Sequence, residues 1–176
     1  MKKKMKVHFS SASNEWATPQ ALFNRIAERY GPFDLDPCCT DKTALCNAYY
    51  TAKENGLIRS WGNVRIDGEA TRVFCNPPYG RQIGKWVQKA YEESLKGVIV
   101  VCLIPSRTDT QWWHQYCMKA VKIDFIKGRV KFEQNGKVGT VSAPFPSCLV
   151  VFSYNFPAIK VDRAPVMGIM DANETD

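Results

Sequence analysis

The sequence predicts an α/β fold built on an open, mostly parallel sheet, with an antiparallel strand or hairpin at its C-terminal edge. Strand-like and helix-like hydrophobic patterns alternate along residues 71–126, which is the order that produces parallel sheets. Residues 98–104 form a continuous apolar run, typical of a parallel strand covered on both faces. Asn135-Gly136 is a residue pair that hairpin turns favour.

Length and composition indicate one folded domain. The chain has 176 residues, of which 45% are hydrophobic and 23% charged, both ordinary values for a globular protein. We expect a basic flexible tail over residues 1–13, the domain over residues 14–156 and an irregular tail over residues 157–176. We expect a monomer or weak dimer.

The net charge of +7 is compatible with a polyanionic partner, but four of its units lie in the N-terminal tail. No apolar run approaches the roughly 20 residues of a membrane span, so we expect no membrane association. Seven cysteines, an odd number, indicate free thiols in a reducing cytoplasm. Their spacing does not match a zinc site, so we predict no metal.

The elements of the N-terminal part are predicted from local signals. Thr18-Pro19 precedes a helix over residues 20–30, with Thr18 as N-cap and Pro19 at the first helical position. Residues 33–36 are predicted to form a short strand that leads into a loop over residues 37–42. Residues 43–68 give no clear pattern apart from a polar loop around Trp61.

The later elements are clearer. Gly97 is expected to end the helix that precedes the central strand. Strands are predicted over residues 71–75, 98–104, 122–126 and 147–154, helices over 83–96 and 108–121, and a hairpin over 128–140.

The strongest chemical signal is Asn76-Pro77-Pro78-Tyr79, directly after a predicted buried strand. Two prolines fix the backbone and leave carbonyl oxygens free, while Asn76 adds an amide and Tyr79 a flat ring. Such a loop can accept hydrogen bonds from a planar amine and stack on its ring, although an ordinary Pro-Pro turn is the structural alternative. Ligands bind at the carboxyl ends of parallel strands, so the loops after Asp36 and Cys75 should share one crevice.

Asn-Pro-Pro-Tyr in this position resembles the motif of S-adenosylmethionine-dependent amino-methyltransferases. Further matching segments are residues 15–19, residues 33–38, Gly56-Leu57 with Trp61, and residues 128–132. Together they resemble the compact phage-type DNA N-6-adenine methyltransferases, the phage Dam family. The resemblance implies a Rossmann-like methyltransferase fold, double-stranded DNA as partner and, for a phage or prophage protein, the bacterial host cytoplasm.

The resemblance also implies roles for single residues. Asn76 and the Pro77 carbonyl, with Pro78 in the same rigid loop, would accept hydrogen bonds from the N-6 amine of a flipped adenine, on which Tyr79 would stack. The methyl group would pass by direct in-line displacement. S-adenosylmethionine would be bound by eight residues: Trp16, Thr18, Pro19, Asp36, Pro37, Cys38, Asn55 and Asn76.

Some of these assignments have alternatives. The alternative for Thr18 is a plain helix cap, and the alternative for Asp36 is a strand-end turn residue. The glycine-rich loop of related methyltransferases is replaced by Cys38-Cys-Thr-Asp-Lys42, and Asn55 stands where relatives often carry Asp.

DNA contacts are predicted for cations beside the catalytic loop, after the central strand and on the predicted hairpin. These are Arg81, Lys85, Arg107, Lys127, Arg129, Lys131 and Lys137. Solvated surface positions are the alternative for each of them. Two other functions stay open, namely methyl transfer to RNA or to a protein glutamine, and a non-catalytic nucleic-acid-binding relative.

Overall fold

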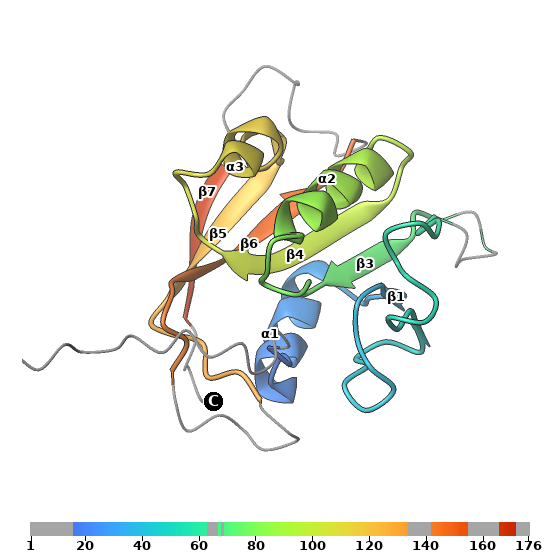
Figure 1. Ribbon diagram of the computed structural model, residues 1–176, viewed down its shortest axis with the longest axis horizontal. Helices are drawn as coiled ribbons and strands as arrows, with labels where there is room; N and C mark the ends of the chain where they lie inside the picture. The colour runs from blue at the N-terminus through green and yellow to red at the C-terminus, as the bar shows by residue number, and fades with distance from the viewer. Residues whose placement is uncertain (1–15, 63–66, 68, 134–141, 155–165, 172–176) are drawn as a thin grey trace, which may run out of the picture.

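A seven-stranded sheet organises the chain, in the strand order β2-β1-β3-β4-β6-β5-β7 (Figure 1). The computed structural model describes residues 16–62, 67, 69–133, 142–154 and 166–171. The strands are β1 (Leu35–Asp36), β2 (Ala48–Tyr49), β3 (Arg72–Cys75), β4 (Ile99–Pro105), β5 (Lys122–Lys127), β6 (Ser147–Phe152) and β7 (Val166–Asp171).

The predicted fold class, an open and mostly parallel α/β sheet, is confirmed, but the antiparallel strand lies elsewhere in it. Neighbouring strands β2, β1, β3 and β4 pair in parallel, whereas β6 pairs antiparallel with both β4 and β5. β6 is therefore an interior strand and not the expected edge. All six of its residues are buried, as expected for a strand with a neighbour on each side.

The C-terminal edge strand is β7, which pairs in parallel with β5 over six residues. The expectation of an irregular segment over residues 157–176 is therefore wrong for residues 166–171. In this strand Met167 and Ile169 are exposed while Met170 is buried. The strand belongs to the same sheet as the domain predicted over residues 14–156, so that predicted boundary ends too early.

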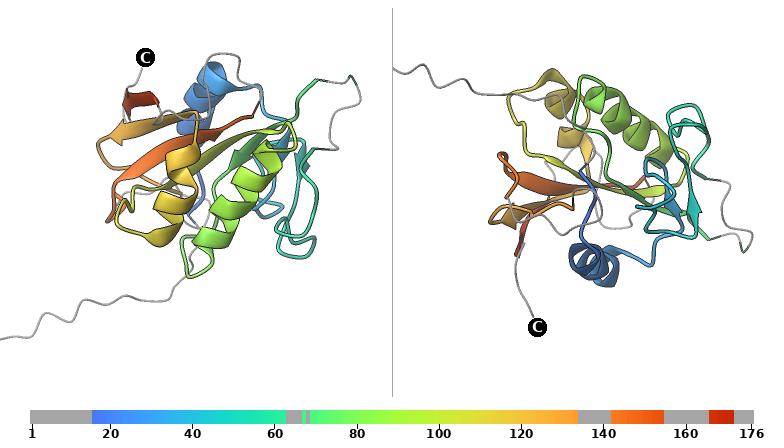
Figure 2. Two further views of the ribbon diagram at one scale, coloured as in Figure 1. Left: turned by 90° about the horizontal axis from the view of Figure 1, so that it is seen from above. Right: turned by 60° about the horizontal axis from the view of Figure 1, so that its bottom comes forward.

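Helices cover both faces of the sheet, as Figure 2 shows from two directions. α1 (Gln20–Tyr30) packs on one face through Leu22, Phe23 and Ile26. On the other face lie α2 (Ile83–Ser94), α3 (Gln111–Gln115) and the 3-10 turn η1 (Cys117–Lys119). Parallel strands need such covering on both sides, because both of their faces carry apolar side chains.

Helix ends differ from the predictions at several points. Pro19, not Thr18, is the N-cap of α1, and no side chain caps this helix. α2 ends two residues earlier than predicted, and Gly97, with a φ of 94°, adopts the left-handed conformation expected near the helix end. The single helix predicted over residues 108–121 is divided into α3 and η1.

Two other predicted segments also differ. Trp61, expected in a polar loop, is fully buried and lies against Trp86 with ring centroids 6.4 Å apart. The Ala143 N–H, three residues beyond the hairpin predicted over residues 128–140, donates to the Val130 carbonyl oxygen at 2.9 Å. The predicted turn at Asn135-Gly136 lies outside the described residues.

Candidate active site

A cavity of about 870 Å³ opens at the carboxyl ends of β1 and β3. Its wall brings together segments far apart in sequence, including the loop after Asp36 and the loop after Cys75. The crevice predicted from strand order is therefore present. The predicted site residues that line it are Trp16, Thr18, Asp36, Pro37, Cys38, Asn55, Asn76, Pro77 and Pro78. Pro19 and Tyr79 do not line it.

Asn76 follows the last residue of β3, and the nitrogen of its side-chain amide has hydrogen-bond partners whereas the oxygen has none among the described residues. Its Nδ2 donates to the Trp16 carbonyl oxygen and, at 2.9 Å, to the Thr18 hydroxyl oxygen. Its Oδ1 is buried and has no hydrogen-bond partner among the described residues. An unpaired buried oxygen costs free energy, so it is rare unless a ligand completes it.

Tyr79 ends the tetrapeptide and is almost fully buried. Its hydroxyl donates to the Leu103 carbonyl oxygen at 3.0 Å, and its ring packs edge-on against Phe132 and Phe145. Trp16 makes edge contacts with the same two rings. Burial raises the pKa of Tyr79 well above its usual value, so this hydroxyl stays protonated at neutral pH.

Asp36, the last residue of β1, has a side chain that lines the cavity and is only 4% exposed. The backbone N–H groups of Cys38 and Leu45 each donate to its carboxylate at 3.4 Å. Burial raises the pKa of Asp36 to about 6, and these hydrogen bonds oppose the shift only in part. No cationic side chain pairs with it in the part of the chain that the structure describes.

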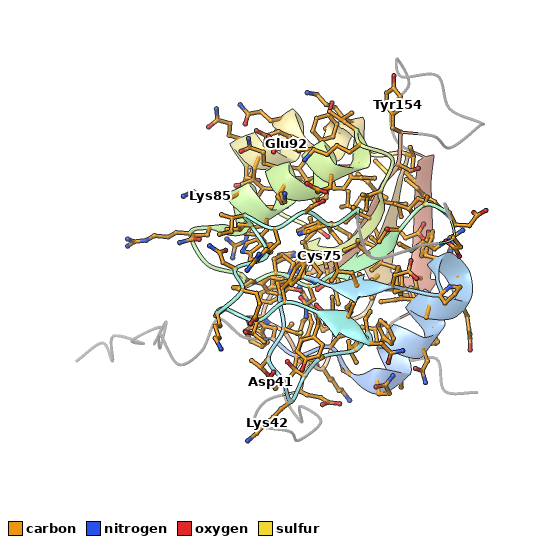
Figure 3. The ribbon with its side chains drawn as sticks, turned by 90° about the vertical axis from the view of Figure 1, so that its right-hand side faces the viewer. Asp41, Lys42, Cys75, Lys85, Glu92 and Tyr154 are labelled. Carbon is orange, nitrogen blue, oxygen red and sulfur yellow. The ribbon has the colours of Figure 1, made fainter. Side chains whose placement is uncertain are left out.

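Cys38, in the loop after β1, lies close to Cys75, the last residue of β3. The Sγ atoms of Cys38 and Cys75 are 3.6 Å apart, and Cys75 is in the middle of the molecule in Figure 3. Burial raises the pKa of both thiols, which keeps them neutral. Neutral buried thiols are poor nucleophiles, so these groups contribute packing rather than reactivity. All seven cysteines are free.

Gly56 explains how the loop after β1 is held without glycines of its own. A Cβ on Gly56 would lie 2.0 Å from the Pro37 carbonyl oxygen, so only glycine permits this approach. The Trp61 indole N–H donates to the Gly56 carbonyl oxygen at 2.9 Å. Asn55, with a φ of 57°, makes the turn before it, and its Oδ1 accepts from the Leu57 N–H at 3.3 Å.

Family comparison agrees with this geometry. Residues 7–174 match the protein family described as DNA N-6-adenine-methyltransferase (Dam). The chain belongs to this Dam family. The family predicted from the motifs is thereby confirmed, and the match includes the C-terminal strand β7.

Two relatives of this Dam-family chain bear names of the same kind. A protein of Escherichia phage T1 named "DNA N-6-adenine-methyltransferase" is 28% identical over 121 residues, which are 69% of this chain and 48% of that protein. A protein of Escherichia coli (strain K12) named "Putative methyltransferase YfdM" is 39% identical over 66 residues, 38% of this chain and 71% of that protein. The chain thus spans about half the length of the phage relative.

The predicted DNA-binding cations follow the carboxyl ends of β3, β4 and β5, which point to one edge of the sheet. All that fall within the described residues are exposed, namely Arg81, Lys85, Arg107, Lys127, Arg129 and Lys131. Lys85 extends outward from the start of α2 (Figure 3). Lys137 lies outside the described residues.

The cavity also contains residues that the sequence did not single out. They include Gln20, Thr51, Trp86 and Glu133. Trp86 was recognisable only as an apolar position of an amphipathic helix. Glu133 reaches the cavity through an isolated antiparallel bridge to Ala17. This contact between distant segments leaves no pattern in the sequence around Glu133.

Within the described ranges, no three His, Cys, Asp or Glu side chains gather as ligands for a metal ion. No helix in the same ranges is long and apolar enough to cross a membrane.

Proposed function

We propose that the protein transfers a methyl group from S-adenosylmethionine to the N-6 amine of adenine in DNA. The observation that carries this proposal is the unpaired, buried Oδ1 of Asn76 in the wall of a large cavity. Membership of the Dam family gives the reaction class. The names of the two relatives, one an adenine methyltransferase and the other a methyltransferase, agree with it.

The amine of adenine is a weak nucleophile, because its lone pair is delocalised into the ring. Hydrogen bonds from this amine to Asn76 Oδ1 and the Pro77 carbonyl oxygen would draw the lone pair back to nitrogen. They would also fix the direction of attack. Alignment and a preorganised pair of acceptors therefore account for catalysis, and a strong general base is not needed.

The charge of the cavity lining supports S-adenosylmethionine as the cofactor of this site. When bound, this cofactor supplies an electrophilic methyl group on a positively charged sulfur. Asp36 is a buried carboxylate without a cationic partner among the described residues, so it suits the positively charged end of the cofactor. Pro37, Cys38, Asn55 and Trp16 would complete the cofactor site, with Pro19 behind them at the N-terminal end of α1.

Contact with the target base would require a rearrangement around Tyr79. The Tyr79 ring is only 6% exposed and contacts Phe132 and Phe145 edge-on. An adenine base could therefore stack on it only after the side chains around the ring move. We propose double-stranded DNA as substrate, with the base flipped out and the exposed cations after β3, β4 and β5 on the phosphates. A monomer or weak dimer in a bacterial cytoplasm fits this role.

The test is methyl transfer by the purified protein. With S-adenosylmethionine and unmethylated duplex DNA, nucleoside mass spectrometry should detect N-6-methyladenine. Asn76→Ala should lower kcat by about 100-fold or more, by analogy with removal of a preorganised hydrogen bond to the reacting group. Asn24→Ala, at an exposed position of α1, is the matched control and should retain activity. Absence of N-6-methyladenine, or transfer only to RNA or a protein glutamine, would overturn the proposal.

A further inference from the structure

We propose that the segment Trp16-Ala17-Thr18 is a clamp that holds the Asn76 amide in the orientation that catalysis needs, with Thr18 as its positioning residue. This inference rests on the proposed function of Asn76. The clamp accepts both hydrogen atoms of Asn76 Nδ2, one at the Trp16 carbonyl and one at the Thr18 hydroxyl. Thr18 and Asn76 are 58 positions apart in sequence.

The structure argues against a capping role for Thr18. The N-cap of α1 is Pro19, and no side chain bonds to the free N–H groups of the first turn. Thr18 is only 6% exposed, and its hydroxyl oxygen lies 2.9 Å from Asn76 Nδ2. The side chain therefore serves the loop after β3 and not the helix that follows it.

An amide side chain is nearly symmetrical in shape but opposite in chemistry at its two ends. In the observed orientation Nδ2 faces two acceptors and leaves Oδ1 as the free acceptor. The reversed orientation would place Oδ1 against the Trp16 carbonyl oxygen, which has no hydrogen to donate. It would also present an N–H group to an incoming amine. The clamp therefore selects the only orientation in which Asn76 can accept from the substrate.

The clamp is itself anchored to the segment after β5. The Glu133 N–H donates to the Ala17 carbonyl oxygen at 2.8 Å, and Trp16 packs edge-on against Phe132. Arg129 and Lys131, two exposed cations predicted to contact DNA, lie in this same segment. The orientation of Asn76 thus depends on how residues 129–133 are placed.

Three substitutions separate positioning from the other roles of Thr18. Thr18→Val keeps the shape of the side chain but removes the oxygen, whereas Thr18→Ser keeps the oxygen. Thr71→Val is the matched control. Thr71 is likewise buried, and its hydroxyl donates to the Gly62 carbonyl oxygen at 3.1 Å, away from the cavity lining. If Thr18→Val does not fold, Thr18→Ala gives the same test.

We expect Thr18→Val to lower kcat about tenfold, the equivalent of one lost hydrogen bond. The Kd for S-adenosylmethionine and the KM for DNA should stay within about twofold, because Thr18 acts through Asn76. Thr18→Ser should restore kcat to within about threefold of wild type. Thr71→Val should lower stability and leave kcat unchanged.

A second measurement requires no activity and no cofactor. In ¹⁵N-labelled protein, the side-chain amide signals of Asn76 are those that disappear in Asn76→Ala. Their hydrogens should exchange slowly with solvent in wild type and in Thr18→Ser, and faster in Thr18→Val.

Two results would overturn the clamp while leaving the proposed function intact. One is an active wild type whose Thr18→Val variant keeps both kcat and slow amide exchange. The other is a raised Kd for S-adenosylmethionine with unchanged kcat, which would make Thr18 a cofactor contact. An inactive wild type with slow Asn76 exchange that depends on Thr18 would reject the function and keep the clamp.

Discussion

Asp36 and Glu93 are both buried carboxylates, but the protein surrounds them differently. Glu93, on α2, has no exposed side-chain surface and accepts from Lys89 at 2.6 Å, from Lys96 at 2.8 Å and from the Trp61 N–H at 3.0 Å. Within the described residues, Asp36 accepts from two backbone N–H groups at 3.4 Å and from the weak Cys39 thiol, and from no cationic side chain.

Their pKa values follow these surroundings. Burial alone would raise the pKa of Glu93, but the hydrogen bonds from Lys89, Lys96 and Trp61 outweigh burial, so this pKa lies below its usual value. Burial dominates at Asp36 and raises its pKa to about 6. Glu93 is thus neutralised by the protein itself and fastens the Trp61 loop to α2. Asp36 has no cationic side chain paired with it among the described residues, which supports the cofactor site proposed above.

The largest expected effect of this difference is on cofactor binding. Asp36→Asn keeps the shape and removes the charge, so its affinity for S-adenosylmethionine should fall about ten- to hundredfold. Calorimetric titration measures it. Glu93→Gln is the control and should bind the cofactor with wild-type affinity. Equal loss in both variants would show that the comparison reflects general damage to the fold.

The same substitution should change the pH dependence of stability. The pKa of Asp36 is raised in the folded state, so between about pH 4 and pH 6 the folded chain binds more protons at this site than the unfolded chain. Its contribution therefore lowers the free energy of unfolding as pH rises through this window. At pH 7 Asp36→Asn should be more stable than wild type, by on the order of 2 kcal/mol, and at pH 4 the difference should disappear. Urea unfolding at several pH values measures it.

Glu93→Gln should have the opposite effect on stability. It leaves Lys89 without its charged partner in a site where the Lys89 side chain is only 14% exposed. The free energy of unfolding should fall by roughly 1–2 kcal/mol, with unchanged kcat for the folded fraction. Urea unfolding and an activity assay on the same preparation measure both. A stabilised Glu93→Gln variant would contradict the structural role of this carboxylate.

The part of the candidate site that was predictable from the sequence is the part that depends only on the order of the strands. Asp36 is the last residue of β1 and Asn76 comes directly after β3, and parallel neighbours bring such strand ends to one edge of a sheet. The Asn76 tetrapeptide added its own chemistry, so the crevice and its main residues followed from the sequence.

Contacts between distant segments were not predictable. No local pattern links Thr18 to Asn76 or Glu133 to Ala17, because tertiary packing alone brings these segments together. The antiparallel direction of β6 was also hidden, since a fully apolar strand has the same pattern in either direction. β7 was missed because Gly168 interrupts it and two of its larger side chains, Met167 and Ile169, face solvent.

The smallest expected effect separates two lysines one turn apart on α2. Lys89 is held by Glu93 and lies 5.8 Å from the centre of the Trp61 ring, whereas Lys85 is exposed and has no ion pair within the described residues. Lys85→Ala should weaken DNA binding only a few-fold and reduce the slope of log affinity against log salt by about one unit. Lys89→Ala should leave that slope unchanged and lower stability by about 1 kcal/mol. Binding isotherms at several salt concentrations decide the matter. A Lys89→Ala variant that instead changes the slope as much as Lys85→Ala would contradict the assignment, because an ion-paired lysine would then contribute to DNA binding as much as an unpaired one.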